Sequence, residues 1–537
     1  MLKAIKLFGP PGCGKTSTEM KFYRNLLDKG VTVEDITAVT FRLTSAEDLI
    51  NNVIQKTKSN RKIVKKHVGT IHSICNRLIG YNTLISPKEI SDFLKEYRYA
   101  PYMKSKKQKF LCSVNPEITD TDEIVQSGDL FDMYTWLMNT QTPIDSWYKY
   151  PGSGNISMPE NMVPDFINDY VQYKLKINRI DYSDMLQKVI DEKIELDTSV
   201  LIADEFQDFT TQMSRVFSSW SASCQQVIIA GDPLQSIYGF WGSSPSYYQD
   251  FNAKEVILQK SHRLPSQVWN LASEILRSEG MKTPSVHAKE GYLNPVRFLN
   301  WDDPTPVYNS ELHLVRCNYQ SWSLAMKLAE EGKLFGGLNG WTYEEMNIAS
   351  AVNTFRSGKQ LTRNHILTLV ECYPLGMFGR WKSRKELTDS INSFYTPSSP
   401  RISTDPVFMT QGIVKSLLSK DPTYLMNAGN KLLQAKVNGV KDSSLNIPCI
   451  ELDDAIRKYK PKFSRNILTF HGAKGLEAET VFLHTAVTPT IEKTLVIPGE
   501  ESQAEARVWY VGVTRAKEVL YVVRDEGKTY QLPEVCA

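Results

Sequence analysis

Short runs of branched apolar residues alternate with helical patterns along this chain, and this alternation limits the fold more than any other feature of the sequence. Near-continuous apolar strands separated by helices are typical of parallel sheets that are covered on both faces. The candidate strands fall into two groups, namely 2–8, 36–41, 199–205 and 225–232, then 313–318, 466–472, 480–486 and 519–525. The pattern therefore predicts an α/β protein with parallel sheets.

Two long stretches lack this alternation of apolar strands and helices. Residues from about 82 to 178 are rich in Tyr, Lys and polar residues, and those from about 360 to 455 contain many turn-forming residues. Because a single hydrophobic core stops growing near about 250–300 residues, a chain of 537 residues should contain several folding units. We interpret both stretches as insertions into the sheet domains.

The composition is ordinary for a soluble globular protein, and we expect the protein to be cytoplasmic. The eight cysteines are scattered without a CxxC pair, which argues against a zinc ribbon and against a disulfide framework. No apolar run approaches the roughly 18 residues of a membrane span, and the first residues lack a signal-peptide pattern. The formal net charge is only +3, so a nucleic-acid partner would need a local groove instead of a globally basic surface.

A phosphate-binding loop is the strongest single motif. The segment GPPGCGKT fits G-x-x-x-x-G-K-[ST] and stands between a candidate strand and a helical pattern. In that setting backbone N–H groups close around phosphate oxygens, and the helix N-terminus adds its dipole. We expect Lys15 to reach the terminal phosphates and Thr16 to offer its hydroxyl to Mg²⁺. The residues expected to bind the nucleotide here are Gly9, Pro10, Pro11, Gly12, Cys13, Gly14, Lys15, Thr16 and Ser17.

Two adjacent acids end another candidate strand, in the segment LIADEFQDFTTQ (201–212). A magnesium ion that bridges the β- and γ-phosphates needs a carboxylate from a neighbouring strand end, and hydrolysis needs a group that orients the attacking water. The loop and the acids together therefore predict Asp204 as the metal ligand and Glu205 as the catalytic base.

The strand at 225–232 is followed by Gln235, which could contact the γ-phosphate, and then by Tyr238, Phe240 and Trp241. One loop thus joins a phosphate sensor to stacking surfaces of the size of a base. Kinases, GTPases, transporter motors and translocases all contain phosphate loops, and the aromatic cluster favours a translocase. The alternative is that these aromatic side chains belong to the core.

Several short segments follow one another in a fixed order: GPPGCGKT (9–16), AVTF (38–41), GTIHS (69–73), DYSDML (181–186), DEFQD (204–208), GDPLQSIYGF (231–240), HRLPSQV (262–268), TFHGAKGLE (469–477) and VWYVGVTRAK (508–517). In this order they resemble the motifs of superfamily 1 helicases of the UvrD, Rep and PcrA type. The resemblance implies two RecA-like domains, each with an inserted subdomain, with ATP in the cleft between them and single-stranded DNA across their tops. The implied division is 1–81 with 179–255 for the first core, 256–359 with 456–537 for the second core, and 82–178 and 360–455 for the insertions.

The resemblance also implies roles for residues of the second core. Arg263 and Arg515 would be arginine fingers that act with Lys15, Glu205 and Gln235 in catalysis. The residues of this core implied to contact the nucleotide are His262, Arg263, Gly475, Glu477 and Arg515.

The residues implied to contact single-stranded DNA are of two kinds. Side chains that stack on or clamp bases tolerate any base sequence, whereas contacts to phosphates and sugars position the strand without reading it. The first kind comprises Phe41, His72, Tyr238 and Phe240, and the second comprises Thr70, Thr469 and His471.

The sequence departs from the family pattern in three places. Only eight residues precede Gly9, where relatives carry a glutamine motif for the adenine base, so nucleotide preference is not predicted. His262 replaces a tyrosine that stacks on adenine. Trp241 replaces an arginine, and its indole belongs either to the DNA path or to the packing.

We therefore expect an enzyme that uses ATP and Mg²⁺, moves on single-stranded DNA and unwinds duplex at single-strand/duplex junctions, with the 3′→5′ polarity that the resemblance implies. Replication or repair proteins are candidate partners, and no membrane is expected. One alternative is a superfamily 1 helicase that runs 5′→3′ or acts on RNA. The other is a DNA-dependent loading or binding factor that does not unwind. The basic clusters at 56–67 and 104–109 could contact duplex or form solvated faces.

Overall fold

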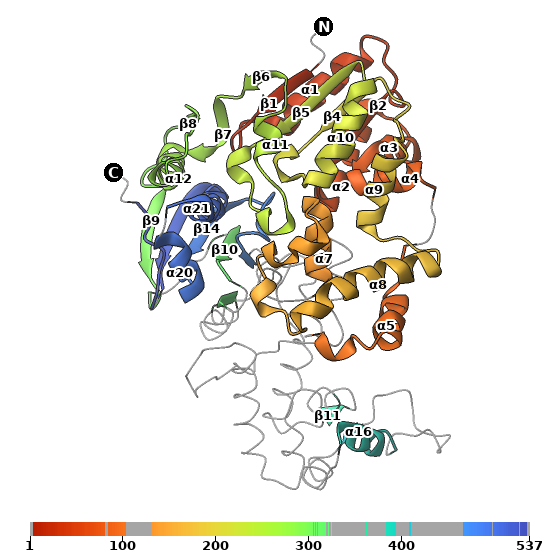
Figure 1. Ribbon diagram of the computed structural model, residues 1–537. Coiled ribbons are helices and arrows are strands. Elements are labelled where there is room, and N and C mark those ends of the chain that lie inside the picture. The colour runs from red at the N-terminus through yellow and green to blue at the C-terminus, as the bar shows by residue number, and fades with distance from the viewer. Residues whose placement is uncertain are drawn as a thin grey trace. The chain divides into compact units, whose positions relative to one another are not determined.

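The computed structural model describes part of the chain in detail. The described residues are 4–80, 84–103, 130–303 and 465–533, apart from 497 and 526, with only short pieces between 304 and 464, chiefly 310–317 and 383–393. The basic cluster at 104–109 and nearly all of the predicted insertion at 360–455 lie outside these residues. The chain forms two compact units, of which the first comprises 1–299, 473–483 and 487–537, and the second 300–472 and 484–486 (Figure 1).

A six-stranded sheet lies at the centre of the first unit, in the order β3-β2-β4-β5-β1-β6. Its strands are β1 (Ala4–Phe8), β2 (Ile36–Thr40), β3 (Val68–Thr70), β4 (Val200–Ala203), β5 (Gln226–Gly231) and β6 (Lys254–Ile257). Each neighbouring pair is parallel. The predicted α/β class with parallel strands is confirmed.

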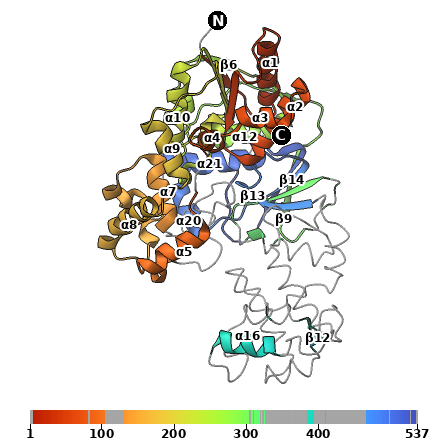
Figure 2. The same ribbon diagram turned by 90° about the vertical axis from the view of Figure 1, so that its right-hand side faces the viewer.

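Helices cover both faces of this sheet (Figure 2). One face carries α1 (Lys15–Leu27) and α2 (Leu43–Thr57), and the other carries α9 (Tyr182–Asp191) and α10 (Thr211–Ser223). Shorter helices complete this part of the unit, namely α3 (Arg61–His67), α4 (Ile71–Leu78) and α11 (Ser246–Gln249). Every residue of β2 and β4 is buried, which explains why these strands read as continuous apolar runs. Because the strands are parallel, the loops that follow β1, β2, β4 and β5 meet at one edge of the sheet.

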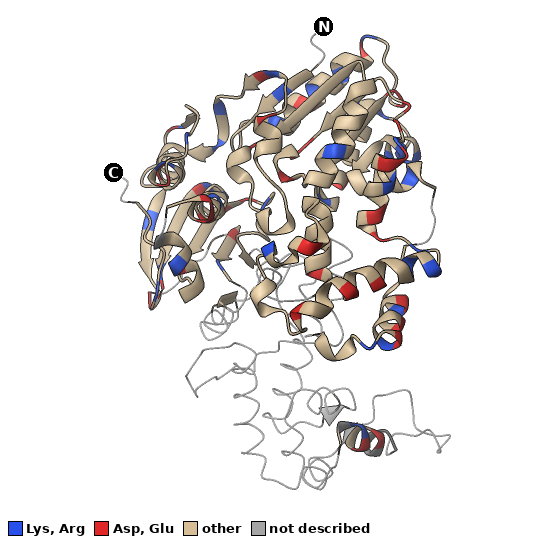
Figure 3. Ribbon diagram, viewed as in Figure 1, with Lys and Arg blue, Asp and Glu red and all other residues tan. Residues whose placement is uncertain are grey.

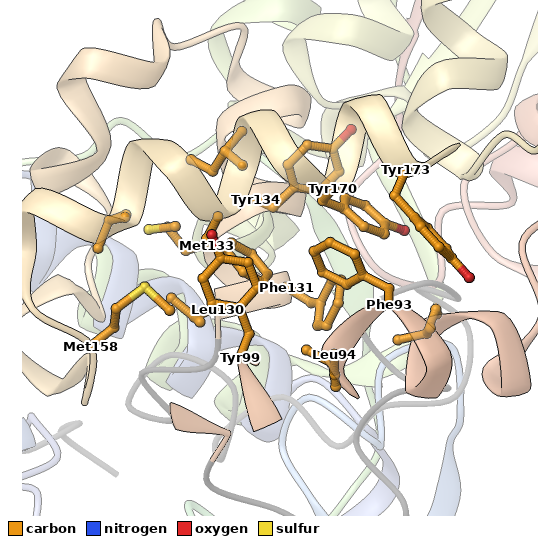
Figure 4. Close-up of a cluster of buried hydrophobic side chains, with 14 of the residues drawn as sticks. Phe93, Leu94, Tyr99, Leu130, Phe131, Met133, Tyr134, Met158, Tyr170 and Tyr173 are labelled. Atoms are coloured by element: carbon orange, nitrogen blue, oxygen red, sulfur yellow. The ribbon is translucent and has the colours of Figure 1, made fainter. Parts of the chain in front are cut away.

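The described part of 82–178 is helical and has its own core (Figure 4). Its helices are α5 (Pro87–Glu96), α7 (Leu130–Thr140) and α8 (Val163–Lys176). Aromatic rings fill the space between them, because Phe93 lies 5.8 Å from Phe166 and 5.3 Å from Tyr170, measured between ring centroids. A capping box of Ser86 and Glu89 begins α5.

A buried lysine joins this subdomain to α9. Lys174 is 2 % exposed, and its Nζ lies 2.5 Å from Oδ2 of both Asp181 and Asp184. The same ammonium donates to the Tyr134 hydroxyl at 2.8 Å. A buried ammonium is stable only when it is paired and hydrogen-bonded, and here all three partners are present.

The first unit also contains strands and helices from both ends of the second predicted core. These are β7 (Lys260–Pro265), α12 (Ser266–Ser278), β8 (His287–Lys289), β9 (Val296–Asn300), β14 (Ala478–His484), α20 (Pro489–Val496), α21 (Glu500–Val513) and β15 (Ala516–Arg524). β15 lies between β14 and β9 in their sheet, and Trp509 of α21 stacks on Tyr530 with ring centroids 4.2 Å apart.

The described elements of the second unit are β10 (Glu311–Val315), β11 (Leu361–Thr362), α16 (Arg384–Ser393), β12 (Phe408–Met409) and β13 (Arg465–Thr469). β10 and β13 pair in parallel, and β11 and β12 pair antiparallel. Over the part of the chain with described structure, no helix is both long and apolar enough to cross a membrane.

Candidate nucleotide site and nucleic-acid surface

The phosphate loop joins β1 to α1, and its first glycine sets the path of Lys15. The Gly9 N–H donates to the carbonyl of Gly231 on β5 at 3.2 Å. A Cβ at position 9 would lie 2.1 Å from Cγ of Lys15. Only a residue without a side chain there allows the Lys15 stem to fold back across the loop.

The other loop residues are either packed or open to solvent. Cys13 is buried, and burial together with the charge of Asp232 raises the pKa of its thiol to about 12, so that it stays protonated at neutral pH. The Cys13 N–H donates to the carbonyl of Pro10 at 3.1 Å. Thr16 and Ser17 are exposed on the first turn of α1, and so their hydroxyls are accessible to a ligand.

The HRLP segment on β7 packs directly against the phosphate loop. The hydroxyl of Ser261 donates to the carbonyl of Pro11 at 3.0 Å, and the N–H of His262 donates to the carbonyl of Gly12 at 2.9 Å. Gly12 has a φ of +75°, and a Cβ there would lie 2.4 Å from Cβ of Arg263. Glycine is therefore required at position 12 both by its backbone conformation and by the close approach of β7.

Asp204 and Glu205 follow β4 and face Lys15. The Asp204 N–H donates to the carbonyl of Val39 on β2 at 2.9 Å, and Lys15 Nζ lies 3.6 Å from Oε1 of Glu205. Glu205 has a φ of 51°, a conformation that is uncommon for a residue with a side chain and costs about 1–3 kcal/mol.

The pKa values of the two neighbouring carboxyls are shifted in opposite directions. Burial, followed by the charge of Glu205, raises the pKa of Asp204 to about 7. Burial alone would also raise the pKa of Glu205, but the charges of Lys15 and Lys474 and a hydrogen bond from Gln207 outweigh it and lower that pKa to about 2. Glu205 is therefore ionised at neutral pH and can accept a proton.

Gln235 and Arg515 meet at the end of β5. Gln235 lies in a short 3₁₀ turn (Pro233–Gln235), and its Nε2 donates to Oδ2 of Asp232 at 2.8 Å. Its Oε1 accepts from Nη2 of Arg515 at 2.9 Å. Burial and the charge of Arg263 lower the pKa of Arg515 to about 10, so the guanidinium remains charged at neutral pH.

Arg263 and Glu477 form an ion pair at the same site. Glu477 also accepts from Nζ of Lys517 at 2.7 Å. Burial would raise the pKa of Glu477, but the hydrogen bond from Lys517 and the charge of Arg263 lower it. The loop that holds Glu477 turns at Gly475, whose φ is +88°. Both predicted fingers thus lie in the first unit with the phosphate loop, and Arg515 is hydrogen-bonded to Gln235.

Three buried residues that we did not single out from the sequence connect these parts. Lys474 is 6 % exposed, and its Nζ lies 2.6 Å from Oδ2 of Asp208 and 2.6 Å from the carbonyl of Gln235. Gln207 accepts from the Asp232 N–H at 3.0 Å and donates to Oε2 of Glu205 at 2.5 Å. The DEFQD motif contains Gln207 and Asp208, and the TFHGAKGLE motif contains Lys474. Their place in these motifs was the only feature of the sequence that pointed to a role for them.

The donor set at the edge of the sheet suits Mg²⁺. This ion prefers oxygen ligands and usually takes one or two carboxylates from a protein. Thr16 offers an exposed hydroxyl and Asp204 a buried carboxyl. Buried oxygens of Glu19 and Thr40 have no hydrogen-bond partner among the described residues. Oxygen groups that lack partners in the protein are what a bound cation and its waters would satisfy.

The predicted stacking residues form a chain of ring contacts. The ring of Phe41 lies 5.4 Å from that of Tyr238, which lies 6.0 Å from Phe240, and Phe240 lies 6.2 Å from Trp241. Phe41, Tyr238 and Trp241 are buried, and Phe240 is partly exposed. The carbonyl of Trp241 accepts from Nδ2 of Asn139 on α7 at 3.0 Å.

A pocket opens beside these rings, between the sheet domain and the helical subdomain. Its lining residues are Phe41, His72, Phe131, Tyr134, Thr135, Asn139, Tyr170, Asp181, Tyr182, Ser183, Met213 and Trp241. His72 packs edge-on against Tyr182 with ring centroids 5.6 Å apart. Burial lowers the pKa of His72 to about 4, so at neutral pH this ring is uncharged and offers only a face and a polar edge.

The residues predicted to contact phosphates and sugars are divided between the units. Thr70 begins α4, and its hydroxyl accepts from the Ser73 N–H at 3.2 Å. Thr469 and His471 are buried and lie in the second unit, where the Thr469 hydroxyl accepts from the Gly472 N–H at 3.1 Å.

Charged residues of both signs are scattered over the ribbon of the first unit (Figure 3). In the basic cluster at 56–67, Arg61 forms an ion pair with Glu47, and Lys65 Nζ lies 2.8 Å from the same carboxylate. This cluster is therefore partly neutralised within the protein.

Comparison with known proteins agrees with this geometry. The family described as UvrD/REP helicase N-terminal domain matches residues 2–255, and that described as UvrD-like helicase C-terminal domain matches residues 450–526. The chain is 22% identical to DNA helicase II of Rickettsia typhi, over 99% of this chain and 92% of that protein. It is 21% identical to the probable DNA helicase II homolog of Mycoplasma pneumoniae, over 96% and 81% of the two chains.

A third relative, the ATP-dependent DNA helicase PcrA of Staphylococcus aureus, is 20% identical over 95% of this chain and 80% of its own length. The matched families together cover more than half of the chain, including the phosphate loop, the DEFQD acids and Arg515. The chain therefore belongs to the UvrD-like family of ATP-dependent DNA helicases, built on RecA-like domains.

Proposed function

We propose that the protein moves 3′→5′ along single-stranded DNA and separates duplex at single-strand/duplex junctions, with each step driven by ATP hydrolysis beside Lys15 and Glu205. The 3′→5′ polarity comes from the resemblance to superfamily 1 helicases. The observation that supports coupling between the nucleotide and the DNA is the hydrogen bond of 2.9 Å between Arg515 and Gln235. It joins a guanidinium of the VWYVGVTRAK motif to the loop that leads into the aromatic contacts, so one loop would lie next to both the triphosphate and the DNA.

In the proposed reaction, Lys15 binds the β- and γ-phosphates and is drawn away from Glu205. Glu205, already ionised, accepts a proton from the water that attacks the γ-phosphorus, while the bond from this phosphorus to the β,γ-bridging oxygen breaks and ADP leaves. Thr16 and Asp204 would hold Mg²⁺, which neutralises charge on the phosphates when it is bound. Arg263 and Arg515 stabilise the charge on the transferring phosphoryl group, and such a finger is typically worth about 10³–10⁵ in rate.

The nucleotide and the DNA are coupled through the loop after β5. Lys474 binds the Gln235 carbonyl and lies 4.9 Å from the centroid of the Tyr238 ring. Loss of the γ-phosphate frees Gln235 and Arg515, and a movement of this loop changes the grip of Tyr238 and Phe41 on a base. Each stacked base contributes about 1–3 kcal/mol, which is of the same size as the average cost of about 1.4 kcal/mol for separating one base-pair step.

The test combines ATP hydrolysis with strand separation. Hydrolysis is measured with no nucleic acid, with single-stranded DNA and with RNA, and unwinding is measured on duplexes with a 3′ or a 5′ tail. We expect stimulation by DNA and unwinding from 3′ tails. Unwinding from 5′ tails alone, or stimulation by RNA alone, would identify the alternative helicase class. Stimulated hydrolysis without strand separation would identify a loading or binding factor.

Two substitutions test the assigned residues. Lys15→Ala should abolish nucleotide binding and turnover. Glu205→Gln should lower kcat by at least about 100-fold while nucleotide binding persists, because the amide keeps the shape of the side chain but cannot accept a proton. Glu255→Gln on the edge strand β6 is a matched control, since the Glu255 side chain is 42 % exposed and its partner, Lys6, lies 3.6 Å away. Normal turnover of Glu205→Gln would show that the base is another residue.

A further inference from the structure

A buried carboxyl in the first helix is not used by any of the steps above. Glu19 lies one helical turn after Lys15 on α1 and is 0 % exposed. Neither of its carboxyl oxygens has a hydrogen-bond partner among the described residues. Burial of an acid without a partner is costly, and native proteins rarely retain such groups without a ligand or a function.

The nearest acid is Asp204. Burial and the charge of Asp204 raise the pKa of Glu19 well above its usual range, and a single shared proton would join the two carboxyls by a hydrogen bond. When both are ionised, each can only accept, so the pair requires a cation. A further unpartnered oxygen belongs to Thr40, which follows Val39, the residue whose carbonyl accepts from the Asp204 N–H.

No basic side chain of the described chain lies within ion-pair distance of Glu19, although the charge of Lys15 acts on it from farther away. Lys15 is the closest candidate, but its Nζ forms an ion pair with Glu205 at 3.6 Å, and in the proposed function it moves to the phosphates. Among the described residues, Glu19 forms no ion pair with Lys, Arg or His. A hard divalent cation with oxygen ligands matches the chemistry of the carboxyl pair and the adjacent hydroxyl.

We propose that Glu19 is a second carboxylate of the divalent-metal site and acts with Asp204 to hold the Mg²⁺ that accompanies ATP. This inference rests on the proposed function, because it assumes that ATP binds beside Lys15. The second carboxylate raises the affinity of the site for the metal. It also allows the site to take up a divalent ion before the nucleotide arrives.

The experiment measures metal binding rather than turnover. Binding of a fluorescent ATP analogue is followed while Mg²⁺ is titrated, and binding of Mn²⁺ to the nucleotide-free protein is followed by electron paramagnetic resonance. In Glu19→Gln we expect the Mg²⁺ concentration at half-maximal nucleotide binding to rise by about 10–100-fold, and Mn²⁺ binding without nucleotide to be lost. Nucleotide affinity in EDTA should stay at the wild-type value.

A matched control comes from the same helix. Tyr23 lies one turn further along α1, is 2 % exposed, and also has a buried oxygen without a partner. Tyr23→Phe should keep the wild-type metal dependence, and Glu19→Asp should retain part of the Mn²⁺ binding because the charge is kept on a shorter side chain. Thermal unfolding in EDTA confirms that all three variants are folded.

The outcomes separate this inference from the proposed function. If Glu19→Gln is folded and keeps the wild-type Mg²⁺ and Mn²⁺ dependence, Glu19 is only a protonated core residue and the inference is wrong. If Glu19→Gln does not fold, unchanged metal binding in Glu19→Asp contradicts the inference in the same way. If wild-type protein shows no Mg²⁺-dependent nucleotide binding, the proposed function itself fails.

Discussion

The pKa values of individual titratable residues at the site are set by the charged and buried groups around each side chain, and not by the position of the residue in the sequence. Asp204 and Glu205 are adjacent, yet the pKa of the first is raised to about 7 by burial and by the charge of Glu205. The pKa of the second is lowered to about 2 because the charges of Lys15 and Lys474 exceed the effect of burial. The two lysines therefore keep Glu205 ionised, as its proposed role as the base requires.

His72 gives a prediction about pH. Burial lowers its pKa from the ordinary 6.5 to about 4. Between pH 6.5 and pH 4, His72 is protonated in the unfolded chain but stays neutral in the folded chain. The free energy of unfolding that is present above pH 6.5 is therefore partly lost as the pH falls toward 4. By pH 4.5 this loss amounts to about 2–3 kcal/mol.

Urea unfolding at pH 7 and at pH 4.5 measures this effect. His72→Phe keeps the ring packed against Tyr182 but removes the titration, so its free energy of unfolding should fall less with pH than that of the wild type. Equal losses in the two proteins would show that His72 is protonated in the folded state.

The role of a single residue was predictable where one sequence motif contains both the residue and the groups with which it acts. The sequence predicted that Lys15 belongs to a strand–loop–helix unit, and the structure agrees. It did not predict the role of Lys474, because its partner Asp208 is 266 residues away and the need for a buried cation appears only when the two segments meet.

Among the elements, the loop at 473–477 has the clearest energetic role. Lys474 contacts Asp208 and the carbonyl of Gln235, and Nη1 of Arg42 donates to the carbonyl of Lys474 at 2.9 Å. Asp208 is 1 % exposed. The loop therefore joins segments that follow β2, β4 and β5 through one residue, because the Lys474 ammonium contacts the last two and its backbone carbonyl contacts the first.

Lys474→Met should destabilise the first unit by about 3–5 kcal/mol, because it leaves the Asp208 carboxylate buried without a cation. Chemical denaturation measures the change. Adding Asp208→Asn should recover part of it, since the second change removes the unpaired charge. Lys517→Met is the control, because its pair with Glu477 is 42 % exposed on the lysine side and is worth at most about 1 kcal/mol. A loss no larger than that of the control would mean that the buried pair contributes little.

Buried strands were predictable and exposed strands were not. The apolar runs at 36–41 and 199–205 correspond to β2 and β4, because both faces of these strands are covered. β6 and β7 gave no such signal, since most of their residues are exposed or polar. β7 is the element that packs against the phosphate loop, so the contact between HRLP and the loop could not be predicted from hydrophobic patterns.

For the molecule as a whole, the formal net charge of +3 gives little long-range attraction to DNA. The salt dependence of binding should therefore reflect local contacts, with a slope of about −0.7 for each phosphate contacted on a single strand. Residues 473–483 and 487–537 join residues 1–299 in the first unit through contacts that are distant in sequence, and the predicted division into two cores and two insertions stays a prediction.

Replacing the lysines of the cluster at 104–109 with alanine should leave the slope for single-stranded DNA unchanged, because we assign the strand to the rings around Phe41 and Tyr238. Fluorescence anisotropy between about 50 and 200 mM salt measures the slope. A decrease of about 0.7 for each lysine removed would place this cluster on the single strand. A decrease seen only with a junction substrate would place it on duplex.

The left-handed backbone at Glu205 also determines which inactive variants this protein tolerates. Asparagine and glycine adopt that conformation more easily than glutamate, so Glu205→Asn and Glu205→Gly relieve strain while they remove the carboxylate. A selection for folded protein without hydrolysis would enrich these two exchanges. These two variants would give complexes that keep bound nucleotide and DNA without hydrolysis, which suits structure determination of the DNA-bound state.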